Sequence, residues 1–144
     1  MPAIGRSLTY AACLCAAAAG GAAGSVEIRD LLLALSTSLE DGRAARFLAQ
    51  VDRTRVARYA ELEQNVVALA AQNQVASSIR LLDEQADGQA YDLKLDWLLE
   101  MRPAGSLGRL VTRREQVRCR VARSGRRWKV VALEPVEFFR APER

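Results

Sequence analysis

The side chains in this chain that could perform chemistry are its carboxylates and, outside the first 24 residues, a single cysteine, Cys119. The sequence has no histidine, which excludes histidine-dependent triads, histidine-ligated metal sites and histidine general bases. One cysteine alone cannot form a thiolate metal site. The glycine-containing segment 105–108 is too short for a phosphate-binding loop and lacks the lysine that follows in such loops. We therefore expect neither a metal site nor a cofactor.

Four carboxylates are candidates for a general base, which is the remaining route to catalysis. Asp96 has the outward parity of its strand, and Asp52 stands at an expected helix start, where capping is the commoner role. Asp83 keeps the inward parity of the apolar residues before it but lies near a turn, and Glu115 lies near an expected strand irregularity. Because no two acids converge on one place, we predict no catalytic residue.

Cys119 is expected to be inert. It alternates with Val117 and Val121 and therefore points into the core. A cysteine in an apolar strand usually behaves as a small hydrophobic residue, and no histidine is present to activate it. A nucleophilic role is the less favoured alternative.

Residues 1–24 have the pattern of a secretory signal peptide. Arg6 precedes an apolar stretch from Leu8 to Ala19, which is shorter than the roughly 20 residues needed to span a bilayer. Small residues allow cleavage before Ser25, or alternatively before Gly20. We predict an exported protein, periplasmic or secreted, with no transmembrane segment in the mature chain. An apolar, unstructured N-terminus is the alternative.

Two further cysteines, Cys13 and Cys15, lie inside the signal peptide. Lipidation at Cys13 is not expected, because Tyr10 departs from the pattern that precedes a lipidated cysteine. After cleavage no intrachain disulfide is possible, so the core alone must stabilise the fold. The mature chain, residues 25–144, has the length of a single domain.

Apolar residues recur at helical spacing up to about residue 74. The pattern predicts a helix from Val26 to Leu39, a short helix from Arg43 to Gln50 and a third helix that ends near Gln72. Asp52 or Thr54 is expected to cap the third helix.

From residue 74 onward the apolar residues alternate, which predicts strands. The clearest runs from Tyr91 to Met101, with apolar residues on odd positions, as in an antiparallel strand with one buried face. Pro135 is expected to mark the edge or the end of the last strand. Helices followed by strands favour an α+β domain, in which N-terminal helices pack on a curved four-stranded antiparallel sheet. The four expected strands span residues 74–83, 91–101, 110–123 and 127–137.

Local features over roughly residues 28–139 carry a family resemblance. They are Phe47-Leu48 followed by Asp52, the long helix with Tyr59, the pair Asp96-Trp97 and the ending Gly125-Arg126-Arg127-Trp128-Lys129-Val130. In order and spacing, the chain resembles the nuclear transport factor two-like superfamily, also described as the cystatin-like cone fold. The resemblance implies a curved sheet and a long helix that enclose an apolar pocket open at one end. The superfamily contains isomerases, dehydratases and hydrolases as well as modules without known catalysis, so the fold does not decide the function.

Six residues are expected at that apolar pocket, where they would contact a small apolar or aromatic ligand. For the aromatic side chains among them we favour the other interpretation, that they fill the cone, since aromatics at core spacing mostly belong to the core. The six residues are Tyr59, Leu95, Trp97, Leu99, Cys119 and Trp128.

A basic patch is expected at Arg118, Arg120 and Arg123, which project from one hairpin. It could attract phosphate, anionic lipid or another polyanion. We favour a solvated strand face, partly neutralised by acids on the neighbouring strand. Nucleic acid is not expected as a partner, because exposed aromatics for base stacking are lacking. The neutralising acids are Asp92, Asp96 and Glu100.

The last strand has apolar residues on both parities, and Val131 and Leu133 share the face opposite Trp128. This predicts a homodimer contact, unless the C-terminal tail folds back over the strand. We predict an exported, non-enzymatic module that binds a small apolar ligand in the cone pocket or assembles with itself or with another envelope protein. The alternative is a small-molecule isomerase, hydrolase or dehydratase that uses a lone cavity carboxylate.

Overall fold

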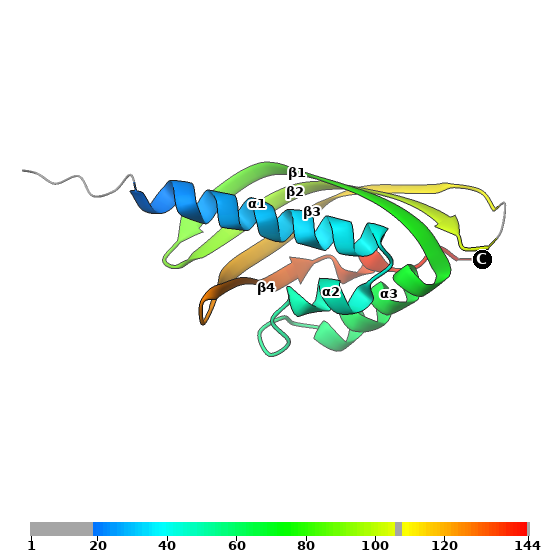
Figure 1. Ribbon diagram of the computed structural model, residues 1–144, viewed down its shortest axis with the longest axis horizontal. Coiled ribbons are helices and arrows are strands. Elements are labelled where there is room, and N and C mark those ends of the chain that lie inside the picture. Colours follow the sequence, from blue (N-terminus) through cyan, green and yellow to red (C-terminus); the bar gives the residue numbers. More distant parts are fainter. Residues whose placement is uncertain (1–18, 106–107, 144) are drawn as a thin grey trace, which may run out of the picture.

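The protein consists of three helices followed by a four-stranded sheet, in a computed structural model that describes residues 19–105 and 108–143 (Figure 1). The strands form an antiparallel meander in the order β1-β2-β3-β4. This confirms the predicted α+β class and sheet. The helices are α1 (Ala19–Glu40), α2 (Ala44–Ala49) and α3 (Tyr59–Gln72). The strands are β1 (Asn73–Asp87), β2 (Ala90–Pro103), β3 (Val111–Ser124) and β4 (Arg127–Glu134), followed by the short 3-10 helix η1 (Val136–Phe139).

The helices cover one face of the curved sheet, and the core lies between these two layers (Figure 1). Alternate residues of β2 point toward the helices, and Leu93 to Met101 on the odd positions are at most 2% exposed. Helix α1 supplies Ile28, Leu32 and Leu35, which recur at helical spacing and are also buried. The other face of the sheet carries the intervening polar residues of β2 and β3 and is open to solvent.

Helix α1 begins before the predicted start at Val26 and includes both expected cleavage positions. Most of the predicted signal peptide, residues 1–18, lies outside the described residues, so the prediction stands as made. No helix in the described part of the chain is long and apolar enough to cross a membrane.

The start of the third helix differs from the prediction. The Asp52 carboxylate does accept hydrogen bonds from the backbone N–H groups of Thr54 and Arg55, but it caps only a single turn. Arg58 then adopts a left-handed conformation with φ of 61°, which no regular helix can include. Helix α3 therefore begins at Tyr59, seven residues after the predicted cap.

Two single-residue bulges change which face several side chains occupy. In β1, Leu81 pairs with Leu95 and Asp83 pairs with Lys94, so Leu82 is the extra residue. Asp83 therefore lies on the outer face with Lys94, and the predicted inward parity of Asp83 is wrong. The parity count assumed an uninterrupted strand, and one inserted residue reverses every side chain beyond it.

The second bulge lies in β4 at Val131, because Val121 pairs with Val130 and Arg120 pairs with Ala132. Leu133 consequently points into the core and is 1% exposed, while Val131 is half-buried. The predicted homodimer contact at Leu133 is therefore wrong, since that side chain is covered by its own fold.

The β2–β3 pairing runs without a register shift past Glu115, so the irregularity expected there does not occur. The edge of β4 is partly paired. Val51 forms a parallel bridge with Val130, through N–H to carbonyl bonds of 2.8 Å on either side. This bridge ties the segment after α2 to the sheet and covers part of an otherwise open edge.

Candidate functional site

The interior between the helices and the sheet is filled by four aromatic rings. Trp97 of β2 lies 5.0 Å from Phe139 and 5.9 Å from Phe138, measured between ring centroids, and 6.5 Å from Phe47 of α2. All four side chains are at most 1% exposed. The C-terminal tail thus folds under the sheet and contributes two of the rings. Tilted and edge-to-face rings at these distances form a packed cluster rather than the wall of an open cavity.

The indole of Trp97 is also fixed by a hydrogen bond. Its Nε1–H donates to Ser77 Oγ at 2.8 Å, and the hydroxyl of Ser36 on α1 bonds to the same oxygen at 2.9 Å. The two serines link α1, β1 and β2 around the ring. Among the described residues, no fully buried side-chain nitrogen or oxygen lacks a partner. The described side chains around Trp97 therefore pack against one another and leave no unsatisfied polar group for a ligand.

The six residues expected to line the pocket do not gather around one cavity. Leu95, Trp97 and Leu99 are 0% exposed and belong to the packed core. Tyr59 lies half-buried at the start of α3, with the Arg53 guanidinium 6.0 Å from its ring centroid. Burial, with the neighbouring Glu63 carboxylate, raises the pKa of Tyr59 above its usual value.

Trp128 lies at the other end of the sheet, on the helix-covered face. Its ring is 5.5 Å from that of Tyr91, and the Arg123 guanidinium lies 5.0 Å from its centroid. Its Nε1–H donates to the Glu27 carboxylate of α1, which also pairs with Arg123. Trp128 therefore closes the end of the core instead of opening it.

Cys119 is 2% exposed, between the inward-facing Val117 and Val121. Burial raises the pKa of its thiol from 9.0 to about 12. The thiolate, which is the nucleophilic form, is therefore absent at neutral pH. This geometry agrees with an inert, core-filling cysteine.

None of the four candidate carboxylates faces the interior as a free base. The Asp52 carboxylate accepts from the Thr54 hydroxyl at 2.8 Å as well as from two backbone N–H groups, and these bonds lower its pKa. Asp96 is held by Arg114 at 2.7 Å on the outer face, which lowers its pKa as well. Asp83 is on that outer face too. Glu115 is exposed and lines a separate hollow with Arg113 and Glu137.

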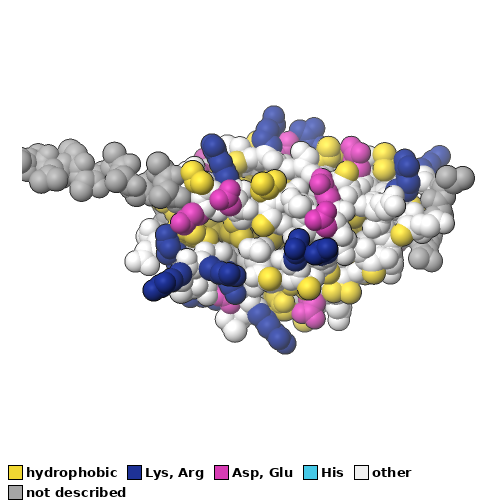
Figure 2. Space-filling model, in the orientation of Figure 1, with side chains coloured by type: hydrophobic (Ala, Val, Ile, Leu, Met, Phe, Trp, Pro, Cys, Tyr) yellow, Lys and Arg dark blue, Asp and Glu magenta, His cyan; other side chains and the backbone are white. Residues whose placement is uncertain are grey.

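The predicted basic patch is divided between the two faces of the sheet. Arg118 and Arg120 point outward, but Arg123 shares the parity of Val121 and lies against α1. Grouping Arg123 with the other two was therefore wrong. Arg120 binds both Asp92 and Asp87, at 2.9 and 3.0 Å, so this arginine is neutralised as favoured, whereas Arg118 has no ion-pair partner among the described residues. The helix-covered side likewise has positive and negative side chains interspersed (Figure 2).

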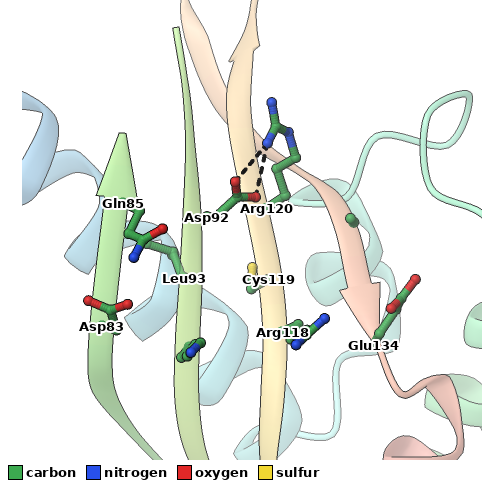
Figure 3. A pocket seen from close by; sticks show the side chains of 10 residues that line it. Asp83, Gln85, Asp92, Leu93, Arg118, Cys119, Arg120 and Glu134 are labelled. Carbon is green, nitrogen blue, oxygen red and sulfur yellow. Dashed lines mark hydrogen bonds and ion pairs between the residues drawn. The ribbon is translucent and has the colours of Figure 1, made fainter. Parts of the chain in front are cut away.

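A hollow of about 400 Å³ lies on the outer face of the sheet, in the half nearer the β1–β2 turn (Figure 3). Side chains from all four strands line it, including Asp83, Lys94, Arg118 and Glu134. The sequence analysis named Arg118 and Arg120 as part of a basic patch, and both line this hollow. It did not predict the acids Asp83 and Glu134 beside them, because the bulges at Leu82 and Val131 decide which acids reach the hollow and alternation alone does not show bulges. No group of three or more metal-ligating side chains occurs among the residues that the structure describes.

Comparison with known proteins identifies the fold. No protein-family model and no curated protein matches the sequence. A conserved protein from Planctomyces limnophilus superposes with a TM-score of 0.68 at 8% identity, over 78% of this chain and 94% of that one. A nuclear transport factor 2-like superfamily protein from Salmonella enterica gives 0.63 at 11% identity, over 78% and 89%.

A type 2 hexachlorocyclohexane dehydrochlorinase gives a TM-score of 0.62 at 12% identity, over 78% of this chain and 84% of that chain. The same fold thus occurs in an enzyme and in proteins without a described activity, and likeness at this identity does not choose between them. The chain has the nuclear transport factor 2-like fold, as the sequence resemblance predicted.

Proposed function

We propose that this protein is an exported, non-enzymatic binding module that recognises its ligand or partner at its surface rather than inside the cone. The observation that carries the proposal is the aromatic cluster of Phe47, Trp97, Phe138 and Phe139, which occupies the place of an internal pocket. A ligand entering the cone would have to displace rings that are already desolvated and tightly packed. Such displacement costs several kcal/mol per ring.

The arrangement of the carboxylates supports the non-enzymatic part of the proposal. A general base must reach the proton it removes, within about 3 Å of a bound substrate. Asp52 is the only buried carboxylate among the described residues, and its oxygens are engaged by Thr54 and Arg55. A lowered pKa also makes it a weak base. Asp96 is committed to Arg114 and Arg80 on the opposite side of the sheet.

Export is compatible with the packing of α1. The described core residues of this helix begin at Ile28, which follows the cleavage position before Ser25. A mature chain cut there would keep Ile28 through Leu39 and their contacts with the sheet. The intact mass of protein recovered from the periplasm measures this directly. A chain that still carries residues 1–24 would contradict the export proposal.

The binding proposal is tested by native mass spectrometry of the protein purified from the periplasm without refolding. We expect the bare mass of the mature chain, because the filled interior has no room for a retained apolar molecule. A stoichiometric apolar adduct would refute a surface-only module and revive the cone pocket. Asp52→Asn would then distinguish a binding protein from an enzyme. An enzyme would still bind the adduct in this variant but would no longer convert it.

Assembly with itself or with another envelope protein stays within this proposal. Leu133 is buried, so a homodimer would have to use a surface other than the one predicted from sequence. The same native spectra report the number of copies. Proteins retained by the purified module at physiological salt would identify a heterologous partner.

A further inference from the structure

A row of four charged side chains crosses the outer face of the sheet, one from each strand. The pairing register places Asp83 beside Lys94, Lys94 beside Arg118 and Arg118 beside Glu134. The charges along this row, which we name the outer row, are therefore negative, positive, positive and negative. Figure 3 looks onto this face and labels Asp83, Arg118 and Glu134 on three separate strands.

The outer row differs from its surroundings because its charges are not paired. Arg120, two residues from Arg118, forms an ion pair with Asp92 on the neighbouring strand and donates to both carboxylate oxygens at 2.9 Å, as the dashed lines in Figure 3 mark. Arg114 binds Asp96 in the same way. No hydrogen bond or ion pair of the four outer-row side chains occurs within the described part of the chain.

Two like charges directly opposite each other on neighbouring strands destabilise a sheet. Lys94 and Arg118 form such a pair, and their flanking acids do not close on them. A compact anion bound between the two cations would remove this repulsion. Both cations line the hollow of about 400 Å³, together with Leu93 and Cys119, their neighbours on β2 and β3. The site is thus concave as well as charged.

We propose that the outer row binds a small zwitterion that carries a phosphate-like anion and an ammonium group about one strand spacing away. The anion lies between Lys94 and Arg118, whose guanidinium can donate two parallel hydrogen bonds to it. The ammonium group lies at Asp83 or Glu134. Neighbouring strands are roughly 5 Å apart, so an anion midway between Lys94 and Arg118 lies about 7 Å from the strands that carry the two acids. An ammonium group about 5 Å from the anion, the span of a two-carbon linker, would then come within hydrogen-bond reach of Asp83 or Glu134. This inference rests on the proposed function, because it names the ligand class of a surface site.

The arrangement disfavours a long polyanion. A chain crossing the strands would meet Asp83 or Glu134 at the ends of the row. A chain running along β2 would meet Asp92 and Asp96, which lie two residues from Lys94 in either direction. Lys94 is therefore flanked by acids in both directions along β2. Along β3, Arg118 is flanked by Gln116 and by Arg120, whose charge is already engaged by Asp92 and Asp87. A compact anion avoids the flanking acids, whereas a long polyanion meets them.

A second copy of the same face is also a poor occupant. A twofold axis parallel to the strands and centred on the row would oppose Lys94 with Arg118 and Asp83 with Glu134. A twofold axis along the row would oppose each residue with itself. Both arrangements set like charges against each other, so the row is not complementary to its own copy.

The test is an NMR titration of the full chain at low salt with two matched compounds, phosphoethanolamine and ethyl phosphate. We expect both to shift the backbone amides near Lys94 and Arg118, and phosphoethanolamine to bind about 2- to 5-fold more tightly through the flanking acids. Arg118→Gln should weaken both about 10-fold. Arg126→Gln removes the same charge from an exposed position outside the hollow, and should change affinity less than 2-fold.

Neutralising the flanking acids gives a result that a nonspecific cationic surface would not produce. In the double variant Asp83→Asn with Glu134→Gln, ethyl phosphate should bind more tightly and the preference for phosphoethanolamine should disappear. Equal loss of binding in the Arg118 and Arg126 variants would overturn the proposal, as would a preference that survives in the double variant. Should a variant fail to fold, the location of shifted amides in the unchanged protein decides, and shifts elsewhere refute the site.

Two controls identify the source of the ligand and separate this inference from the proposed function. Arg118-dependent sedimentation with phosphatidylethanolamine vesicles would place the zwitterion in a lipid headgroup, whereas binding of the free compound alone would place it in solution; either supports the site. Arg118-dependent binding of a heparin fragment tighter than that of phosphoethanolamine would overturn it. Absence of any anion binding, with a bare native mass, refutes the outer-row site and leaves the surface module standing. An internal adduct refutes the module instead.

Discussion

The buried thiol of Cys119 should make the protein lose stability in mild alkali. The thiol pKa is raised by burial from 9.0 to about 12, so the folded protein keeps its proton where the unfolded chain has released it. Between these values the unfolded state binds fewer protons than the folded state. The free energy of unfolding therefore falls as the pH rises above about 9, and below that value the thiol has no effect.

The magnitude follows from the size of the shift. Each unit of pH between the two pKa values costs about 1.4 kcal/mol, so the loss is about 1.4 kcal/mol at pH 10 and approaches about 4 kcal/mol at pH 12. A loss of this size at pH 10 is a large fraction of the stability of a typical small domain. Tyrosine and lysine side chains also titrate in this range, so the contribution of Cys119 must be isolated by comparison.

The assay is urea unfolding of the protein and of Cys119→Ala at pH 7, 8, 9 and 10 under reducing conditions. The substitution removes one sulfur from the core, which lowers stability by a constant amount at every pH. The difference between the two proteins should therefore stay constant to about pH 8.5 and then move by about 1.4 kcal/mol in favour of the variant by pH 10. A difference that stays flat to pH 10 would show that the thiol is not desolvated, and the argument against a nucleophilic cysteine would fail with it.

Trp97, Arg113 and Asp52 test other parts of the packing. Trp97→Leu removes the hydrogen bond to Ser77 and much of the ring volume, so the free energy of unfolding should fall by about 3 kcal/mol. The variant should also bind indole in the space left behind, as measured by calorimetry. Indole binding to the unchanged protein would contradict a filled interior. Arg113 donates hydrogen bonds to two carbonyl oxygens within residues 138–140. Arg113→Met should therefore lower the free energy of unfolding by about 1 to 2 kcal/mol and accelerate hydrogen exchange in η1. Unchanged exchange in η1 would show that these hydrogen bonds do not hold the C-terminal segment in place. The pKa of Asp52 is lowered in the folded protein, so its carboxylate adds stability above the unfolded-state pKa near 3.8, and this stability is lost as the pH falls through the folded-state pKa. Asp52→Ala should therefore make the melting temperature depend less on pH below about pH 4. The same pH dependence in the variant and the unchanged protein would rule this linkage out.

The order of the elements could be predicted because burial repeats with the period of each element. Leu93 to Met101 alternate in the sequence and alternate in the structure, since only one face of β2 is covered by helices. The start of α3 could not be read in the same way. The Asp52 cap is real, but the path of the chain after that turn depends on Arg58, whose side chain binds Glu61 and Glu137 while its backbone turns left-handed. A local cap signal does not show how many turns it begins.

The filled interior was one of two alternatives that the sequence left open. The inward direction of Trp97 follows from its parity, but the space around it depends on rings from distant parts of the chain. Phe47 arrives from α2, and Phe138 and Phe139 arrive from η1 after β4. Whether inward side chains line a pocket or fill it is a property of such long-range contacts. The spacing of apolar residues in the sequence shows only which way each side chain points.

The outer row shows how strongly the site depends on the two bulges. If β1 paired without a bulge, Asp83 would stand opposite Leu93 and face the core. If β4 paired without a bulge, Glu134 would face the core and Leu133 would face solvent. Each bulge therefore places an acid beside one of the outer row's two cations, which have no ion-pair partner in the described part of the chain, and the two acids lie at opposite edges of the sheet. Bulges are over-represented at sheet edges, where β1 and β4 both lie, and next to functional sites, where they redirect a side chain. Both bulges bring an acid to the same row, and this symmetric pattern of charge supports the proposed outer-row site.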